Sequence, residues 1–276
     1  MVIKKVIAIL SLSTIILMSC LSTDTQMINL EKVKSTHKEK NSVENSENLK
    51  KFVDSKPVID AMKMNKMKKL IYVMDPHCGW CYGNSKNIET VAEQFKDKLN
   101  IQLMVGGMWL EGNAPNGGEE FSRFIAKHSP QMEATTGAFV SSIFFELTKD
   151  STYTFSSLEP CCAINLVKEL KPNMAITFAK EVQKAIFAEG KRLDNIETYL
   201  PIIKGLNINA KQFQLRWMKD DNLSKTKEEF DYTKQLVNGF PTLLLYDENQ
   251  IQIIASGYFN TKQIIEKIKN LTTIKN

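Results

Sequence analysis

The chain has 276 residues, of which 43% are hydrophobic and 24% charged, so it is long and apolar enough to bury a sizeable core. Its net charge of +5 is unevenly distributed, because residues 1–70 carry 13 lysines and 7 acidic residues whereas the remainder has a net charge of −1. Phosphate binding needs positive charge gathered on a folded surface, so this distribution disfavours a nucleic-acid-binding protein.

The N-terminus has the pattern of an export signal. Lys4 and Lys5 precede the mostly apolar residues 6–18, a run too short to span a bilayer comfortably as a permanent helix. The run ends in LMSC (17–20), which resembles the lipobox of bacterial lipoproteins. The resemblance implies a signal peptide over 1–20 and a lipid on Cys20, which would anchor the protein to a membrane on the periplasmic or surface side of the cell envelope. An ordinary secretory signal is the alternative.

Residues 21–66 are rich in Ser, Thr, Asn, Lys and Glu and show no sustained apolar period. This composition predicts a disordered tether. Its lysines are interpreted as part of a solvated linker, with weak attraction to anionic lipid headgroups as the alternative.

The stretch LIYVMDPHCGWCYG (70–83) carries the main chemical signal. Residues 70–74 form an apolar run typical of a strand buried on both faces, and Pro76 ends it. Apolar residues then recur at three- and four-residue spacings up to Lys98, which predicts a helix that begins at about Cys78.

A cysteine in the first turn of a helix is chemically distinctive. Unpaired backbone N–H groups and the positive end of the helix dipole favour the thiolate, which is the reactive form of Cys78. Cys81 lies three residues further on, on the same helix face, so the two sulfurs can form a disulfide. We expect Cys78 to attack and Cys81 to resolve, with this redox-active disulfide and no separate cofactor.

Half of a zinc site is the alternative interpretation of one CxxC. Such a site needs a second ligand pair, and the sequence has no second CxxC. Neither Cys161-Cys162 nor the isolated histidines complete a zinc pattern, so no metal is expected.

The rest of the chain predicts a second strand, a helical block and a final hairpin with a helix. Residues 101–105 form the second strand, ended by Gly106-Gly107, and residues 242–246 and 251–256 form the last two strands, joined by a turn at 247–250. A helix over 261–271 follows. Helices separated by breaks such as Ser129-Pro130 are predicted over 121–128, 138–148, 161–170, 174–189, 196–206 and 210–236.

This order is an α/β thioredoxin plan interrupted by helices. Over about 70–271 the chain resembles DsbA-like thiol-disulfide oxidoreductases and predicted protein-disulfide isomerases of the thioredoxin superfamily, whose active stretch reads DPxCGWCYG. The resemblance implies a thioredoxin-like domain at 67–117 and 224–276 with an inserted helical domain at 118–223.

A second mark of the family is the motif NGFPT (238–242). The resemblance implies a cis bond between Phe240 and Pro241, with the Phe240 backbone turned towards the disulfide. It also implies an enzyme that oxidises or isomerises disulfides in unfolded or cysteine-containing exported proteins, with a redox partner that the sequence does not identify. A reductase role remains open.

His77, Trp80 and the pair Cys161-Cys162 each allow two interpretations. His77, if protonated, would add positive charge near Cys78, but a solvated histidine is the simpler reading. Trp80, which with Gly79 separates the cysteines, is expected to contact substrate or to pack against the insertion. Cys161 and Cys162 are interpreted as buried rather than as a second redox pair, and residues 139–147 as core.

Two other functions fit parts of the pattern. A lipid-anchored, non-catalytic chaperone would hold unfolded polypeptide without using the CxxC. A kappa-type glutathione transferase shares the split fold but lacks the resolving cysteine, which this chain retains as Cys81.

Overall fold

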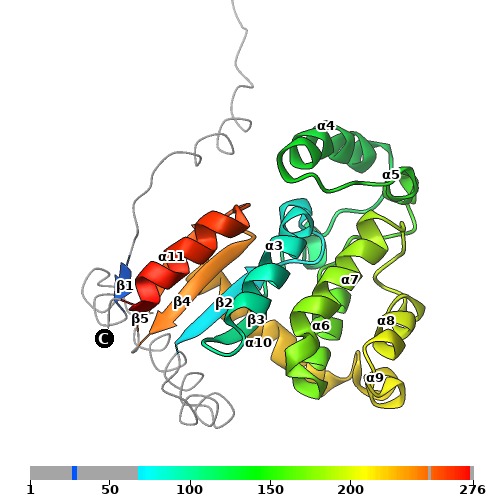
Figure 1. The fold of residues 1–276 in the computed structure, drawn as a ribbon. Helices are drawn as coiled ribbons and strands as arrows, with labels where there is room; N and C mark the ends of the chain where they lie inside the picture. Colours follow the sequence, from blue (N-terminus) through cyan, green and yellow to red (C-terminus); the bar gives the residue numbers. More distant parts are fainter. Residues whose placement is uncertain (1–26, 30–67, 248–249, 274–276) are drawn as a thin grey trace, which may run out of the picture.

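The computed structural model describes residues 27–29, 68–247 and 250–273 (Figure 1). The predicted signal peptide, Cys20 and most of the predicted tether lie outside these residues, as do 248–249 of the predicted turn. No helix within the described ranges is both long and apolar enough to cross a membrane.

A mixed five-stranded sheet, in the order β1-β5-β4-β2-β3, forms the centre of the molecule. β2 runs parallel to β3 and antiparallel to β4, and β4 pairs antiparallel with β5. The four strands predicted from apolar runs are therefore confirmed. Their bounds are β2 (Lys69–Met74), β3 (Asn100–Val105), β4 (Thr242–Asp247) and β5 (Gln250–Ser256).

The fifth strand, β1 (Met27–Asn29), corrects the prediction of a disordered tether at three residues. It pairs antiparallel with the outer edge of β5, in the register Met27 to Gln252. An edge strand has unpaired backbone donors and acceptors, and a short extended segment can satisfy them whatever its sequence. Composition therefore gave no signal for β1.

Alternate residues of β2 supply the cores on the two faces of the sheet. Leu70, Tyr72 and Met74 belong to the larger hydrophobic cluster, which includes side chains of α3 (Gly79–Phe95) and α11 (Thr261–Thr273). Ile71 and Val73 point to the opposite face. Because successive strand residues face opposite sides, the apolar run 70–74 of β2 fits a strand covered on both faces.

Helices occupy the chain between β3 and β4, and Figure 1 shows most of them gathered beyond β3, with α3 between them and α11. The last of these helices runs across residues 223 and 224, where the resemblance placed the boundary between the inserted helical domain and the second part of the thioredoxin-like domain. Besides short 3-10 turns at Glu111–Asn113, Pro172–Met174 and Ile196–Thr198, they are α4 (Glu119–Thr136), α5 (Ser142–Lys149), α6 (Leu158–Leu170), α7 (Ala175–Phe187), α8 (Leu200–Gly205), α9 (Ala210–Arg216) and α10 (Asp220–Leu236).

The helix predicted over 138–148 begins only at Ser142, and the one predicted over 196–206 is divided into a 3-10 turn and α8. Two further differences have a visible cause. α4 continues through Pro130 instead of ending there, because Ser129 and Met132 keep the same face of the helix buried, and this packing offsets the hydrogen bond that proline cannot make. The helix predicted over 210–236 is broken between α9 and α10. There Asn222 donates from Nδ2 to the Trp217 carbonyl at 2.6 Å, which satisfies a backbone acceptor at the break.

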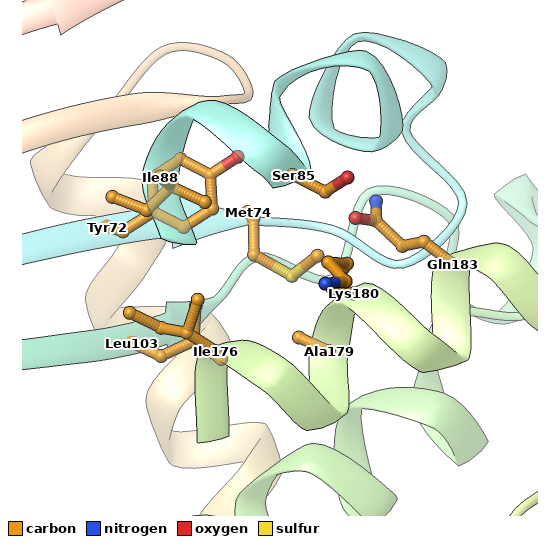
Figure 2. A pocket seen from close by; sticks show the side chains of 9 residues that line it. All are labelled: Tyr72, Met74, Ser85, Ile88, Leu103, Ile176, Ala179, Lys180 and Gln183. Carbon is orange, nitrogen blue, oxygen red and sulfur yellow. The ribbon is translucent and has the colours of Figure 1, made fainter. Parts of the chain in front are cut away.

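α7 connects the inserted helices to the sheet and to α3. Lys180 of α7 pairs with Glu89 of α3 at 2.6 Å. Figure 2 shows side chains from β2, α3, β3 and α7 around a small gap, including Tyr72, Ser85 and Gln183. The helical insertion therefore packs directly against the helix that carries the two cysteines.

Glu229 of α10 links three elements through one partly buried carboxylate. It accepts the Val105 backbone N–H at the end of β3 at 2.7 Å and pairs with Lys168 of α6 at 2.6 Å. The side chains of Lys168 and Glu229 are only 24% and 15% exposed. The end of β3 is therefore held between two helices.

We predict that Glu229→Ala lowers the free energy of unfolding by about 2 kcal/mol, because it leaves a partly buried N–H without its acceptor and a partly buried ammonium without its carboxylate. Urea unfolding followed by circular dichroism measures the change. Glu93→Ala, which removes the exposed Glu93–Lys96 pair, is the control and should keep nearly wild-type stability. Equal stability of the two variants would contradict the assigned role of Glu229.

Candidate redox site

Cys78 is the N-cap residue of α3, so the predicted helix start is confirmed to within one residue. Its Sγ accepts a hydrogen bond from the Cys81 backbone N–H at 3.3 Å, and the Cys81 thiol also hydrogen-bonds to Cys78. The Cys78 N–H donates to the Asp75 carbonyl at 3.1 Å, which closes the turn between β2 and α3. The helix start therefore presents a backbone donor to one sulfur and places the second sulfur beside it.

The two cysteines differ in their surroundings. Cys78 is 6% exposed, whereas Cys81 is completely buried. Burial raises the pKa of the Cys81 thiol well above its ordinary value, and its hydrogen bond to Cys78 raises it further. Cys81 is therefore a protonated thiol at neutral pH, and Cys78 is the sulfur nearer to solvent.

The Phe240 carbonyl faces the more accessible sulfur. The Cys78 thiol donates to this oxygen at 3.5 Å, across a sequence separation of 162 residues. The Phe240-Pro241 bond is cis, as the resemblance implied. On the other side of that bond, the Pro241 carbonyl accepts the Gly257 N–H at 2.7 Å. The segment before β4 is thus fixed against the redox pair.

Asp75 is a site residue that the sequence analysis missed as a functional candidate. It is completely buried, and its carboxylate accepts the His77 N–H at 2.9 Å, the Met108 N–H at 2.7 Å and the Ser157 hydroxyl at 3.1 Å. Burial raises its pKa, while these hydrogen bonds act in the opposite direction. The available signal was an acidic residue directly after the apolar run 70–74.

Both predictions for His77, a protonated ring near Cys78 and a solvated ring, are wrong, since the ring is neither solvated nor charged. Its ring is 4% exposed and lies between Trp109 and Phe155, with ring centroids 5.8 and 5.7 Å away. Its Nε2–H donates to the Ser156 carbonyl at 3.0 Å. Burial lowers the pKa of His77 to about 4, so the ring is neutral at pH 7 and adds no positive charge near Cys78.

No family model and no curated protein matches the chain. Among solved structures, it is similar to a candidate protein disulfide isomerase from Nitrosomonas europaea, with a TM-score of 0.68 and 20% identity over 76% of this chain and 100% of that one. The chain has a DsbA-like thioredoxin fold. The cytosolic disulfide reductase DsbM from Pseudomonas aeruginosa gives a TM-score of 0.61 and 21% identity over 75% and 99% of the two chains. The predicted fold class, with its helical insertion, is confirmed.

The aromatic residues around Cys78 and Cys81 divide into packed and exposed groups. Trp80 is partly buried and packs against the larger hydrophobic cluster, and its contact with substrate stays a prediction. Gly79 lies beside Met132 of α4. Conversely, Phe139 and Ile143 are 67% and 58% exposed. The prediction that residues 139–147 are core is therefore wrong at these two apolar positions, and also at the exposed Ser142 and Glu146. Short amphipathic segments bury only one face, as Phe144 and Leu147 do.

Cys161 and Cys162 are buried, unpaired thiols at the start of α6, which confirms the structural reading of this pair. Burial raises the pKa of Cys161 well above its ordinary value and that of Cys162 to about 11. Both are therefore unreactive thiols at neutral pH. In the described part of the chain, no three His, Cys, Asp or Glu residues gather as a potential metal site.

The neutral state of His77 predicts a specific pH dependence of stability. Its pKa is about 4 in the folded protein and about 6.5 when exposed, so unfolding takes up a proton at pH values between these limits. The free energy of unfolding should therefore fall by about 3 kcal/mol as the pH falls from 7 to 4 through this residue alone.

We predict that His77→Phe removes this contribution, which is measured as the difference between wild type and variant in urea unfolding at pH 7 and pH 4.5. Taking the difference cancels the opposite contribution of Asp75, whose raised pKa favours the folded state as the pH falls. His128→Gln replaces an exposed histidine and is the matched control. An unchanged pH slope in His77→Phe would show that the ring is not held neutral.

Proposed function

We propose that the protein is a thiol-disulfide oxidoreductase that exchanges disulfides through Cys78 and Cys81. The observation that carries this proposal is the asymmetry of the pair. Cys78 caps α3 and receives a backbone N–H, while Cys81 is a fully buried thiol hydrogen-bonded to it. Such a pair supplies one sulfur for attack and one for resolution.

In the oxidising direction, a client thiolate attacks Cys78 Sγ of the Cys78–Cys81 disulfide. A client–Cys78 disulfide forms, and Cys81 leaves as a thiolate that takes up a proton, as its raised pKa requires. A second client thiolate then attacks the client sulfur and releases Cys78 as a thiolate. Two electrons pass from the client to the protein, and the client gains one disulfide. The same steps in reverse reduce a client.

The groups around Cys78 support each half of this exchange. The Cys81 N–H is placed to stabilise negative charge on Cys78 when it leaves the mixed disulfide. Phe240 and Pro241 border the sulfur and precede β4, so an extended client segment has backbone groups to pair with there. Gly79 and Trp80 form the short link that sets the distance between the two sulfurs.

We further propose that the clients are exported proteins and that oxidation or isomerisation is the favoured direction. The export pattern over residues 1–20 and the predicted lipid on Cys20 support a location at the outer side of a membrane. The similar Pseudomonas protein is a cytosolic reductase, so the fold itself is compatible with either direction. The reduction potential of the pair therefore decides the direction.

A non-catalytic chaperone is the second candidate function. The exposed Phe139 and Ile143 favour it, because exposed apolar side chains bind unfolded polypeptide. Phe139 lies beside the redox helix, since the Tyr82 hydroxyl of α3 donates to its carbonyl at 3.1 Å. A chaperone does not need the cysteines, so substitution of Cys78 distinguishes the two functions.

We predict that Cys78→Ser abolishes disulfide exchange and that Cys81→Ser accumulates a mixed disulfide between Cys78 and its client, because the resolving thiol is absent. Oxidation of a reduced two-cysteine peptide, with thiol trapping and mass spectrometry, measures both results. Cys162→Ala removes a buried thiol outside the pair and should exchange at the wild-type rate. Full activity of Cys78→Ser in preventing aggregation, with no exchange in the wild type, would favour the chaperone.

We predict that the reduction potential of Cys78 and Cys81, measured by equilibration in glutathione buffers, identifies the direction of exchange. Oxidase or isomerase activity requires a potential between about −120 and −180 mV, whereas a reductase lies near −270 mV. The fraction of Cys78–Cys81 disulfide, read by mass spectrometry of trapped peptides, gives the value without interference from Cys20. A potential near −270 mV would overturn the preferred direction while leaving thiol-disulfide exchange in place.

A further inference from the structure

The glycine pair that ends β3 lies directly against the residue that faces Cys78. A side chain at Gly106 would place its Cβ 2.0 Å from Cζ and 2.2 Å from Cε1 of the Phe240 ring. Contacts this short do not occur between real atoms, so the ring occupies the space that any larger residue at position 106 would fill. Gly106 is buried, and the mechanism above gives it no role.

We call the space over Gly106 that the Phe240 ring fills the notch. The ring has little freedom to move out of it. It packs against both hydrophobic clusters, one on each face of the sheet. The floor of the notch is fixed as well, because Thr233 of α10 donates to the Val105 carbonyl at 3.0 Å and Glu229 accepts the Val105 N–H. The Phe230 ring covers the next residue, Gly107, whose added Cβ would lie 2.8 Å away.

The ring and the carbonyl that meets Cys78 belong to the same residue. On one side, the Phe240 ring sits on Gly106; on the other, the Phe240 oxygen accepts the Cys78 thiol at 3.5 Å. The following Pro241 is tied to Gly257 by a 2.7 Å hydrogen bond. A ring forced out of the notch must therefore shift the carbonyl, because the chain after it cannot follow freely.

We propose that Gly106 is a positioning residue for thiol-disulfide exchange. Because Gly106 has no side chain, the Phe240 ring packs directly against its backbone. This packing holds the Phe240 carbonyl beside the Cys78 sulfur. The inference rests on the proposed function, since the carbonyl borders the path by which a client sulfur reaches Cys78. Exchange requires the attacking sulfur to approach along the S–S bond, and a misplacement of about 1 Å at a reacting group can cost up to about 100-fold in rate.

The test is a double-mutant cycle of Gly106→Ala and Phe240→Leu in the full chain. The first variant fills the notch, and the second removes the ring atoms that occupy it. We expect each single variant to slow oxidation of a two-cysteine peptide by about tenfold. The double variant, in which the new methyl group replaces the lost ring atoms, should be faster than either single variant. Gly112→Ala lies in the same connection with nothing within 4 Å of the added Cβ, and should match the wild type.

Two further measurements separate positioning from a loss of stability and from a failure of the proposed function. Alkylation of reduced Cys78 by iodoacetamide reports the surroundings of the sulfur without any client, and thermal unfolding reports stability. We expect the alkylation rate to change in Gly106→Ala and to return towards the wild-type rate in the double variant. If the wild type does not oxidise the peptide but the alkylation pattern holds, the proposed function fails and the positioning role stands.

Three results would overturn the inference. The first is wild-type exchange and alkylation by Gly106→Ala. The second is additive slowing in the double variant, because independent sites show no coupling. The third is slowing that merely follows the fraction unfolded. Should Gly106→Ala fail to fold, Phe240→Leu still empties the notch, and wild-type exchange and alkylation by that variant would be equally decisive.

Discussion

The hydrogen bond from the Cys81 N–H to the Cys78 sulfur is the interaction on which the site depends. It exists only because α3 begins directly after Cys78, so that the first unpaired N–H groups of the helix point back at the sulfur. That start is set in turn by the end of β2 and by the turn in which the Cys78 N–H donates to the Asp75 carbonyl. A shift of one residue in the helix start would remove the donor.

The hydrogen bonds of Asp75 attach the helical insertion to the thioredoxin fold. Its carboxylate binds the loop before Cys78, the connection after β3 at Met108, and Ser157, which lies 82 residues away at the start of α6. Burying a carboxylate is costly, and several donors that have no other partner offset this cost. The insertion is therefore anchored at the redox loop, where it also covers the ring of His77.

Local patterns predicted the elements, and tertiary contacts decided what the patterns missed. The apolar run of β2 and the spacing after Cys78 identified the redox helix, and the resemblance supplied the cis bond at Pro241. By contrast, His77 looks like a loop residue until Trp109 and Phe155, which are distant in sequence, enclose it. The notch at Gly106 was equally invisible, since a glycine after a strand usually indicates only a turn.

The buried, neutral His77 bears on how the proposed exchange stabilises charge at Cys78. A positive charge beside the attacking cysteine stabilises the reduced thiolate and makes a disulfide more oxidising. His77 supplies no such charge at pH 7, because burial lowers its pKa to about 4. The donor that the structure places on the Cys78 sulfur is the neutral backbone N–H of Cys81, while burial keeps Cys81 as a thiol. Within the proposed function, negative charge on Cys78 is therefore stabilised by the backbone at the start of α3 rather than by a charged histidine.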